Sequence, residues 1–128
     1  MPGKVNNVIA LSQKPLGDKV FKYWFTFLRP LHDLTDREID VLAAFAKHRY
    51  EMMKVVKDEK LLGTLLMSNE TKKKIREECG ISLAHFQVIM SKLKKSKVVI
   101  NDQLNPKLLP NIDEDSPSLN LLLLFPIK

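Results

Sequence analysis

The sequence predicts a mainly helical fold that ends in a small antiparallel β-sheet. Three observations lead to this prediction. Residues 83–95 carry an apolar stripe at helical spacing, formed by Phe86, Ile89, Met90 and Leu93. A short linker that contains a glycine, residues 80–82, joins this segment to an earlier amphipathic one. Beyond residue 96, two short apolar runs flank a loop that contains three prolines, which is typical of two strands joined by a loop.

Residues 1–33 are expected to form an N-terminal arm followed by a short aromatic helix. The arm has the apolar spacing of a short strand, at Val5, Val8, Ile9 and Leu11. The helix is predicted over residues 18–29 and should end at Pro30. Its aromatic residues Phe21, Trp24 and Phe25 are candidates for self-association or for docking another protein. The competing interpretation is that they complete the core of a monomer.

A second helix is predicted over residues 35–56. Thr35 and Glu38 have the spacing of a capping box, in which each side chain satisfies a free backbone N–H of the first turn. Leu34 stands one position before the cap, where an apolar residue packs against Ile39 as a hydrophobic staple. A further short helix is expected around residues 61–66.

The following segment has the pattern of two helices joined by a tight turn. Ser68 or Asn69 can cap a helix over residues 70–79, and Gly80 stands where a helix ends in a left-handed turn. Ser82 can cap the next helix, predicted over residues 83–95. The side chains expected to be buried between the two helices are Ile75, Cys79, Ile81, Phe86 and Ile89. Cys79 is therefore interpreted as a packed thiol.

Residues 97–100 and 119–125 are predicted to form the two strands of a wing. The order helix, turn, helix, strand, loop, strand resembles the winged helix-turn-helix superfamily, and loosely its MarR-like branch. The segment 34–42 resembles the helix that precedes the DNA-reading motif in that family, and residues 80–82 resemble its turn. The resemblance covers residues 34–125. It implies a winged helix-turn-helix domain over residues 34–128, after the arm and aromatic helix of residues 1–33.

The expected wing departs from the family in its charge. Wings of this family often carry arginine or lysine at the tip, where these residues touch DNA. This sequence instead has Asp113, Glu114 and Asp115 in the loop between the two predicted strands. Phosphate groups would repel this acidic triplet, so it is expected to stay away from a duplex.

The net charge of +6 is confined to one part of the sequence. Residues 72–97, the basic segment, contain two acidic residues and eight basic ones: Lys72, Lys73, Lys74, Arg76, Lys92, Lys94, Lys95 and Lys97. The chain has 21 basic and 15 acidic residues, so 13 of each remain outside this segment and cancel. A charge excess in one segment indicates a polyanionic partner. The alternative is a lysine-rich helix surface that contacts only solvent.

If the helix over residues 83–95 enters a major groove, its apolar stripe determines which side chains face the DNA. The candidate base contacts are His85, Gln87, Ser91, Lys92 and Lys95. The amide of Gln87 can make two hydrogen bonds to adenine. The candidate phosphate contacts are Lys72, Lys73, Lys74, Ser82, Lys94 and Lys97. The alternative is that all of these are ordinary solvated polar positions.

No catalytic or cofactor-binding pattern is found in the sequence. The three histidines lack metal-ligand spacing, the four glycines form no phosphate-binding loop, and one cysteine permits no internal disulfide. We therefore expect no enzymatic activity, no metal and no cofactor. No apolar run reaches the roughly 20 residues of a membrane helix, and the N-terminus has no signal-peptide pattern. No membrane association and a reducing, cytoplasmic location are expected.

Two classes of function remain open. The first is a protein that binds duplex DNA, with or without sequence preference, and regulates transcription or replication in the host cytoplasm. The second is a non-enzymatic structural or adaptor protein of a larger assembly, such as a virion, that uses a winged helix for protein contacts, as some phage-encoded virion and connector proteins do. The basic segment favours the first class. The acidic triplet, the aromatic helix and the apolar residues 121–125 favour the second, and a homo-oligomer or partner protein bound through the aromatic helix is expected.

Overall fold

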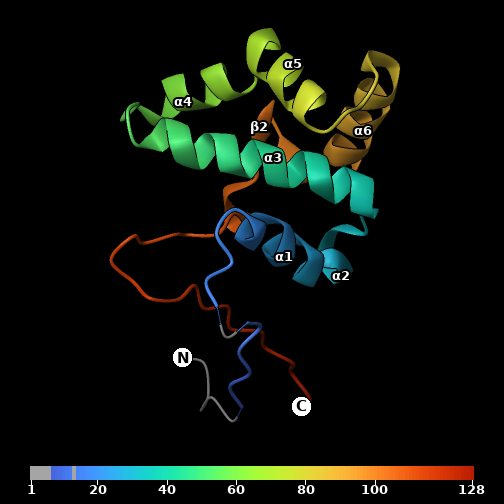
Figure 1. Ribbon diagram of the computed structural model, residues 1–128. Coiled ribbons are helices and arrows are strands. Elements are labelled where there is room, and N and C mark those ends of the chain that lie inside the picture. Colours follow the sequence, from blue (N-terminus) through green and yellow to red (C-terminus); the bar gives the residue numbers. More distant parts are fainter. Residues whose placement is uncertain (1–6, 13) are drawn as a thin grey trace.

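The computed structural model describes residues 7–12 and 14–128 of the 128-residue chain (Figure 1). The described part is mainly helical and has one two-stranded antiparallel sheet, which confirms the predicted fold at this level. Its elements are, in order, α1 (Lys19–Phe27), α2 (Arg29–His32), α3 (Asp36–Met53), α4 (Glu59–Leu66), α5 (Asn69–Glu78), α6 (Leu83–Lys95), β1 (Val99–Ile100), β2 (Gln103–Leu104) and a 3-10 turn (Pro106–Leu108). Figure 1 shows α3 as the central helix, with α1 and α2 on one side and α4, α5 and α6 on the other.

Helix α3 begins with the predicted capping box. The Thr35 hydroxyl accepts a hydrogen bond from the Glu38 N–H at 3.3 Å, and the Thr35 N–H donates to the Glu38 carboxylate at 2.8 Å. Leu34 and Ile39, the predicted staple pair, are both buried. Local sequence therefore fixes both where α3 starts and how the chain enters it.

The helix ends follow the sequence patterns closely, with two exceptions. The helix predicted over residues 35–56 is three residues too long, because α3 ends at Met53. The prediction over residues 83–95 matches α6, and that over 70–79 is displaced by one residue from α5. The prediction over residues 18–29 is wrong at its end, because α1 stops at Phe27 and α2 begins at Arg29. Pro30 does not terminate a helix but lies in the first turn of α2. Backbone N–H groups in a first turn have no acceptor within the helix, so the lack of an N–H in proline costs no hydrogen bond there.

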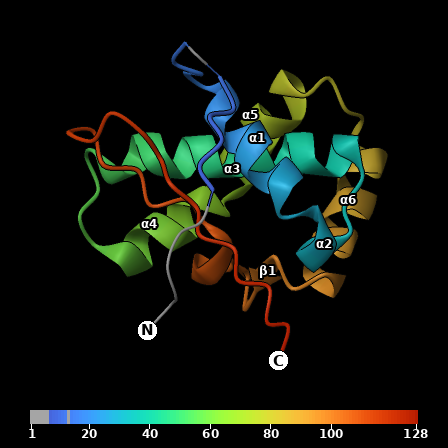
Figure 2. The same ribbon diagram turned by 90° about the horizontal axis from the view of Figure 1, so that it is seen from below.

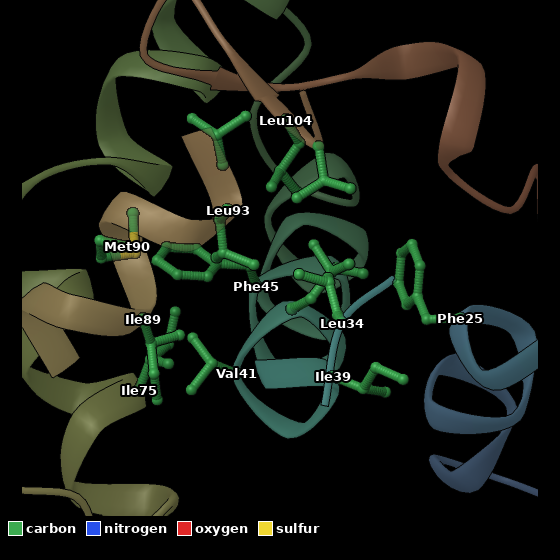
Figure 3. Close-up of a cluster of buried hydrophobic side chains, with 14 of the residues drawn as sticks. Phe25, Leu34, Ile39, Val41, Phe45, Ile75, Ile89, Met90, Leu93 and Leu104 are labelled. Carbon is green, nitrogen blue, oxygen red and sulfur yellow. The ribbon is translucent and has the colours of Figure 1, made fainter. Parts of the chain in front are cut away.

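The hydrophobic core lies between α3 and the helices on both of its sides (Figure 3). Val41 of α3 points toward Ile75 of α5 and Ile89 of α6. The rings of Phe45 on α3 and Phe86 on α6 are tilted against each other, with centroids 6.4 Å apart. All four residues of the apolar stripe of α6 are buried in this core, so the opposite face of the helix is exposed to solvent.

The aromatic helix α1 contributes to this same core. Figure 2, the view from below, shows α1 lying over α3. Phe21 and Phe25 are only 4% and 0% exposed, so they occupy the core of the monomer and are not available for self-association. Trp24 is half-buried, and its indole N–H donates to the Leu108 carbonyl at 2.8 Å. The prediction that these three residues form a contact surface is corrected for Phe21 and Phe25, because helical spacing alone does not distinguish a core face from an interface.

The short α2 segment places a histidine inside the protein. His32 is buried, its Nε2 lies 2.7 Å from the Phe25 carbonyl, and its Nδ1 accepts a hydrogen bond from the Leu34 N–H at 3.0 Å. This pattern defines the neutral tautomer that carries its proton on Nε2. The ring therefore ties the end of α1 to the entry of α3, a role that the sequence did not indicate.

The wing differs from the prediction. β1 pairs with β2, which follows it after only two residues, Asn101 and Asp102. Both have positive φ, 53° and 59°, as a type I′ turn requires, and asparagine and aspartate tolerate this conformation. The predicted second strand over residues 119–125 is wrong, because this segment has no strand partner among the described residues and its side chains from Leu121 to Phe125 are exposed.

The acidic triplet does not lie at the tip of this hairpin. Glu114 accepts a hydrogen bond from the Tyr50 hydroxyl at 2.9 Å and lies 3.5 Å from the Lys54 ammonium, so residues 113–115 rest against the end of α3. The predicted N-terminal strand is also wrong for Val8, Ile9 and Leu11, which are exposed and outside any strand; Val5 lies outside the described residues.

Candidate nucleic-acid interface

The turn between α5 and α6 has the geometry that its sequence predicts. Gly80 has a φ of 63°, and its N–H donates to the Glu77 carbonyl while the N–H of Ile81 donates to the Arg76 carbonyl, each at 3.1 Å. This double hydrogen bond is the Schellman ending of a helix. The Ser82 hydroxyl then accepts from the His85 N–H at 3.2 Å and starts α6. Residues 80–82 thus end α5, turn the chain and start α6, and so determine how the two helices are placed relative to each other.

Apolar contacts and one arginine hold this helix pair on α3. The predicted core positions Ile75, Ile81, Phe86 and Ile89 are buried, whereas Cys79 is half-buried. Burial raises the pKa of the Cys79 thiol, and the nearby charge of Asp40 raises it further, so Cys79 is a poor nucleophile. The Arg37 guanidinium on the first turn of α3 donates to the Cys79 carbonyl at 2.7 Å. This link between α3 and the α5–α6 turn had no signal in the sequence.

The outer face of α6 carries the candidate base contacts. His85, Gln87, Ser91 and Lys95 are exposed, and Lys92 is half-buried. The side chains of Gln87, Ser91, Lys92 and Lys95 make no hydrogen bond or ion pair with the described residues of the chain. They are therefore free to bind an external partner.

The candidate phosphate contacts surround this face. Lys73, Lys74, Ser82, Lys94 and Lys97 are exposed, and Lys72 is half-buried. Lys72, Lys73 and Lys74 lie on α5, Lys94 lies near the end of α6, and Lys97 stands two residues after that end. Figure 1 shows α5 and α6 on the same side of α3. The structure thus brings the two ends of the basic segment to one side of α3.

None of the eight basic residues of the basic segment has a carboxylate within ion-pair distance in the described part of the chain. Several basic residues outside the segment are paired, although others, such as Lys19, Lys60 and Lys107, are not paired within the described residues. The Lys22 ammonium lies 2.8 Å from the Asp40 carboxylate, that of Lys47 lies 3.1 Å from Asp18, and Arg29 pairs with Asp36. Glu78, one of the two acids inside the segment, lies within hydrogen-bond distance of His48 Nε2 on α3, at 3.0 Å. The charge excess seen in the sequence therefore remains uncompensated in three dimensions.

Lys97 combines a positive charge with a strained backbone. Its φ is 63°, and the N–H groups of Lys97 and Val98 donate to the carbonyls of Lys94 and Leu93 at 3.2 and 3.1 Å, as Gly80 and its successor do after α5. A non-glycine residue in this conformation costs on the order of 1 kcal/mol. We expect Lys97→Gly to raise the free energy of unfolding by about 1 kcal/mol in urea denaturation. Lys97→Ala keeps the strain, so it serves as the control, and an equal gain in both variants would contradict this explanation.

Other kinds of site are not found in the described residues. They hold no cluster of three or more His, Cys, Asp or Glu side chains that could bind a metal, and none of their helices has the length and hydropathy to span a membrane. Two shallow depressions, of about 230 and 170 Å³, lie where the end of α3 meets α4 and β2, and both include Arg49. Neither is lined by a residue of α5 or α6.

Comparisons with protein-family models, curated proteins and solved structures find no match to this chain. The observations that bear on function are therefore the charge distribution and the arrangement of α5 and α6.

Proposed function

We propose that the protein binds duplex DNA and acts as a regulator of transcription or replication. The observation that carries this proposal is that eight basic residues lie on α5, on α6 and at Lys97, and that none of them pairs with an acid in the described chain. Free lysines on one side of a protein attract a polyanion and gain affinity by releasing the counterions that surround it.

In this proposal the α5–α6 pair is the helix-turn-helix of a winged domain, and the β1–β2 hairpin is a minimal wing. Helix α6 enters the major groove with the face that points away from the core, and α5 lies across the backbone. Lys72, Lys73 and Lys74 on the first turns of α5 then contact phosphates. The hairpin turn adds no cation, because it consists of Asn101 and Asp102.

The test is a titration of labelled duplex DNA by fluorescence anisotropy at several salt concentrations. If about five lysines meet phosphates, the logarithm of the affinity should fall with the logarithm of the salt concentration at a slope near −4 to −5. Absence of binding even at low salt would rule out the proposal. A slope near zero would also contradict it, because contacts dominated by phosphates must depend on salt.

Gln87 offers a separate prediction about sequence preference. Replacing Gln87 with alanine should weaken binding to duplexes with a suitably placed adenine by about 1–3 kcal/mol, because a bidentate contact to that base is lost. Other duplexes should bind with unchanged affinity, and the salt slope should stay the same. Parallel titrations of several duplex sequences measure this difference. A uniform loss on all sequences would contradict a base-reading role.

A second candidate function is supported by the apolar tail, which we define as residues 121–127. Leu121, Leu122, Leu123, Leu124, Phe125 and Ile127 are all exposed. An apolar surface of this kind is typical of protein–protein contact sites. The second candidate is therefore an adaptor that docks in a larger assembly through the tail.

Light scattering after size-exclusion chromatography tests the second candidate without DNA. The unmodified chain should self-associate through the tail. A variant with serine at Leu122, Leu124 and Phe125 should be monomeric. A monomeric unmodified chain at high concentration would remove the support for self-association through the tail.

A further inference from the structure

The exposed face of α6 has two apolar residues, Ala84 and Val88, at its centre in the N-terminal half. At about 100° per residue, the positions directly opposite its buried residues are Ala84, Val88, Ser91 and Lys95. Val88 is 66% exposed. A β-branched residue at an exposed helix position lowers helix propensity and gains nothing from burial within the monomer. Because Val88 is not buried within the monomer, its side chain is available to contact a partner.

The N-terminal half of this face carries no carboxylate, lysine or arginine, and its one ionisable side chain is His85. Residues 83–91 contain no acid, lysine or arginine, and the cations of α6 begin at Lys92. In helices that lie in a major groove, the N-terminal residues reach the base edges. Guanine is most often read there by arginine or lysine, and the amino group of cytosine is read by a carboxylate. Neither type of side chain is present in this half of α6.

The side chains that are present suit adenine and thymine. A glutamine amide can donate to N7 and accept from N6 of adenine by its two ends, whereas an apolar side chain packs against the C5-methyl group of thymine. Gln87 and Val88 supply these two functions next to each other on the exposed face. Ala84, one turn before Val88, is small enough to let the helix approach the bases closely.

We propose that α6 selects A·T base pairs, with Val88 packed on the C5-methyl group of a thymine and Gln87 bonded to a nearby adenine. This inference rests on the proposed DNA binding and adds the base pairs that the site prefers. Removing one buried methyl group costs about 0.8 kcal/mol, so each thymine methyl contacted contributes about a fourfold increase in affinity.

The experiment compares three labelled duplexes by fluorescence anisotropy at one low salt concentration. The first contains only A·T pairs in mixed order, the second carries deoxyuridine at every thymidine position, and the third contains only G·C pairs. Deoxyuridine lacks only the C5-methyl group and keeps the pairing pattern. The protein should bind the first duplex tightest and lose about fourfold affinity or more on the deoxyuridine duplex.

A double-mutant cycle between Val88 and the methyl group separates direct contact from any effect of deoxyuridine on duplex shape. The Val88→Ala variant should bind the thymidine and deoxyuridine duplexes equally, because alanine does not reach the methyl group. This substitution raises helix propensity, so the fold is retained. Val55→Ala is the matched control: Val55 is 81% exposed and lies outside α6, so its loss should leave the preference unchanged.

The outcomes separate a failure of A·T selection from a failure of the proposed DNA binding. Equal affinity of the unmodified protein for thymidine and deoxyuridine duplexes, with salt-dependent binding intact, overturns thymine reading and leaves DNA binding standing. A preference for the G·C duplex also overturns it. Absence of binding to all three duplexes overturns both proposals.

Discussion

Replacing Lys72, Lys73 and Lys74 with alanine is expected to weaken DNA binding on the order of a hundredfold at 0.1 M salt. Each phosphate contact contributes about 0.9 to the salt slope of a duplex, so losing up to three contacts removes up to about 2.7 powers of ten at this concentration. The loss should be the same for every duplex sequence, because phosphates carry no base information. Anisotropy titrations at several salt concentrations measure both the loss and the flatter slope.

The matched control for this variant removes the same charge elsewhere. Lys19, Lys60 and Lys107 are exposed, belong to no ion pair in the described chain and lie outside α5 and α6. Their triple replacement by alanine lowers the net charge equally. If DNA binding depended on net charge alone, the two variants would lose the same affinity, and the assignment of phosphate contacts to α5 would be wrong.

His32→Ala is expected to lower the free energy of unfolding by about 3 kcal/mol. The buried Leu34 N–H loses its acceptor, and an unsatisfied buried polar group costs about 1–3 kcal/mol. The Phe25 carbonyl loses one of its two donors and keeps the Leu28 N–H at 3.2 Å. The cavity left by the ring adds to this cost. Urea denaturation followed by circular dichroism measures the change.

Two further variants make this result specific. His32→Asn keeps an acceptor near the position of Nδ1, so it should recover part of the lost stability through the Leu34 N–H. His85→Ala removes an exposed histidine and should change stability by less than about 0.5 kcal/mol. A loss as small for His32→Ala as for His85→Ala would contradict the bridging role of His32.

The helices could be predicted from the sequence because their signals are local. Thr35 with Glu38, the glycine at position 80 and the cap at Ser82 each act within three residues of the helix end they define. The apolar period of residues 86–93 then determined which face of α6 is buried, and hence which candidate base contacts are exposed.

The wing and the aromatic helix were predicted less well because they depend on distant contacts. An apolar run such as residues 119–125 does not reveal whether a partner strand exists, whereas the turn at Asn101 and Asp102 pairs β1 with its immediate neighbour. The role of Phe21 and Phe25 depends on α3, which lies later in the chain. Ion pairs were equally invisible, because Lys22 finds its acid at Asp40, 18 positions away.

The apolar tail and the α5–α6 pair lie at opposite ends of the molecule in Figure 1. Glu114 holds the chain against Tyr50 and Lys54 before the tail begins, so the tail leaves on the side away from α6. The free-energy changes at two well-separated sites that share no contacts are close to additive, so binding at one site hardly affects binding at the other. A partner protein bound to the tail would therefore leave α5 and α6 free. If α5 and α6 bind DNA as proposed, the protein would link that partner to a nucleic acid through two separate sites. Several copies held side by side in this way would bind one duplex with far greater avidity than a single chain.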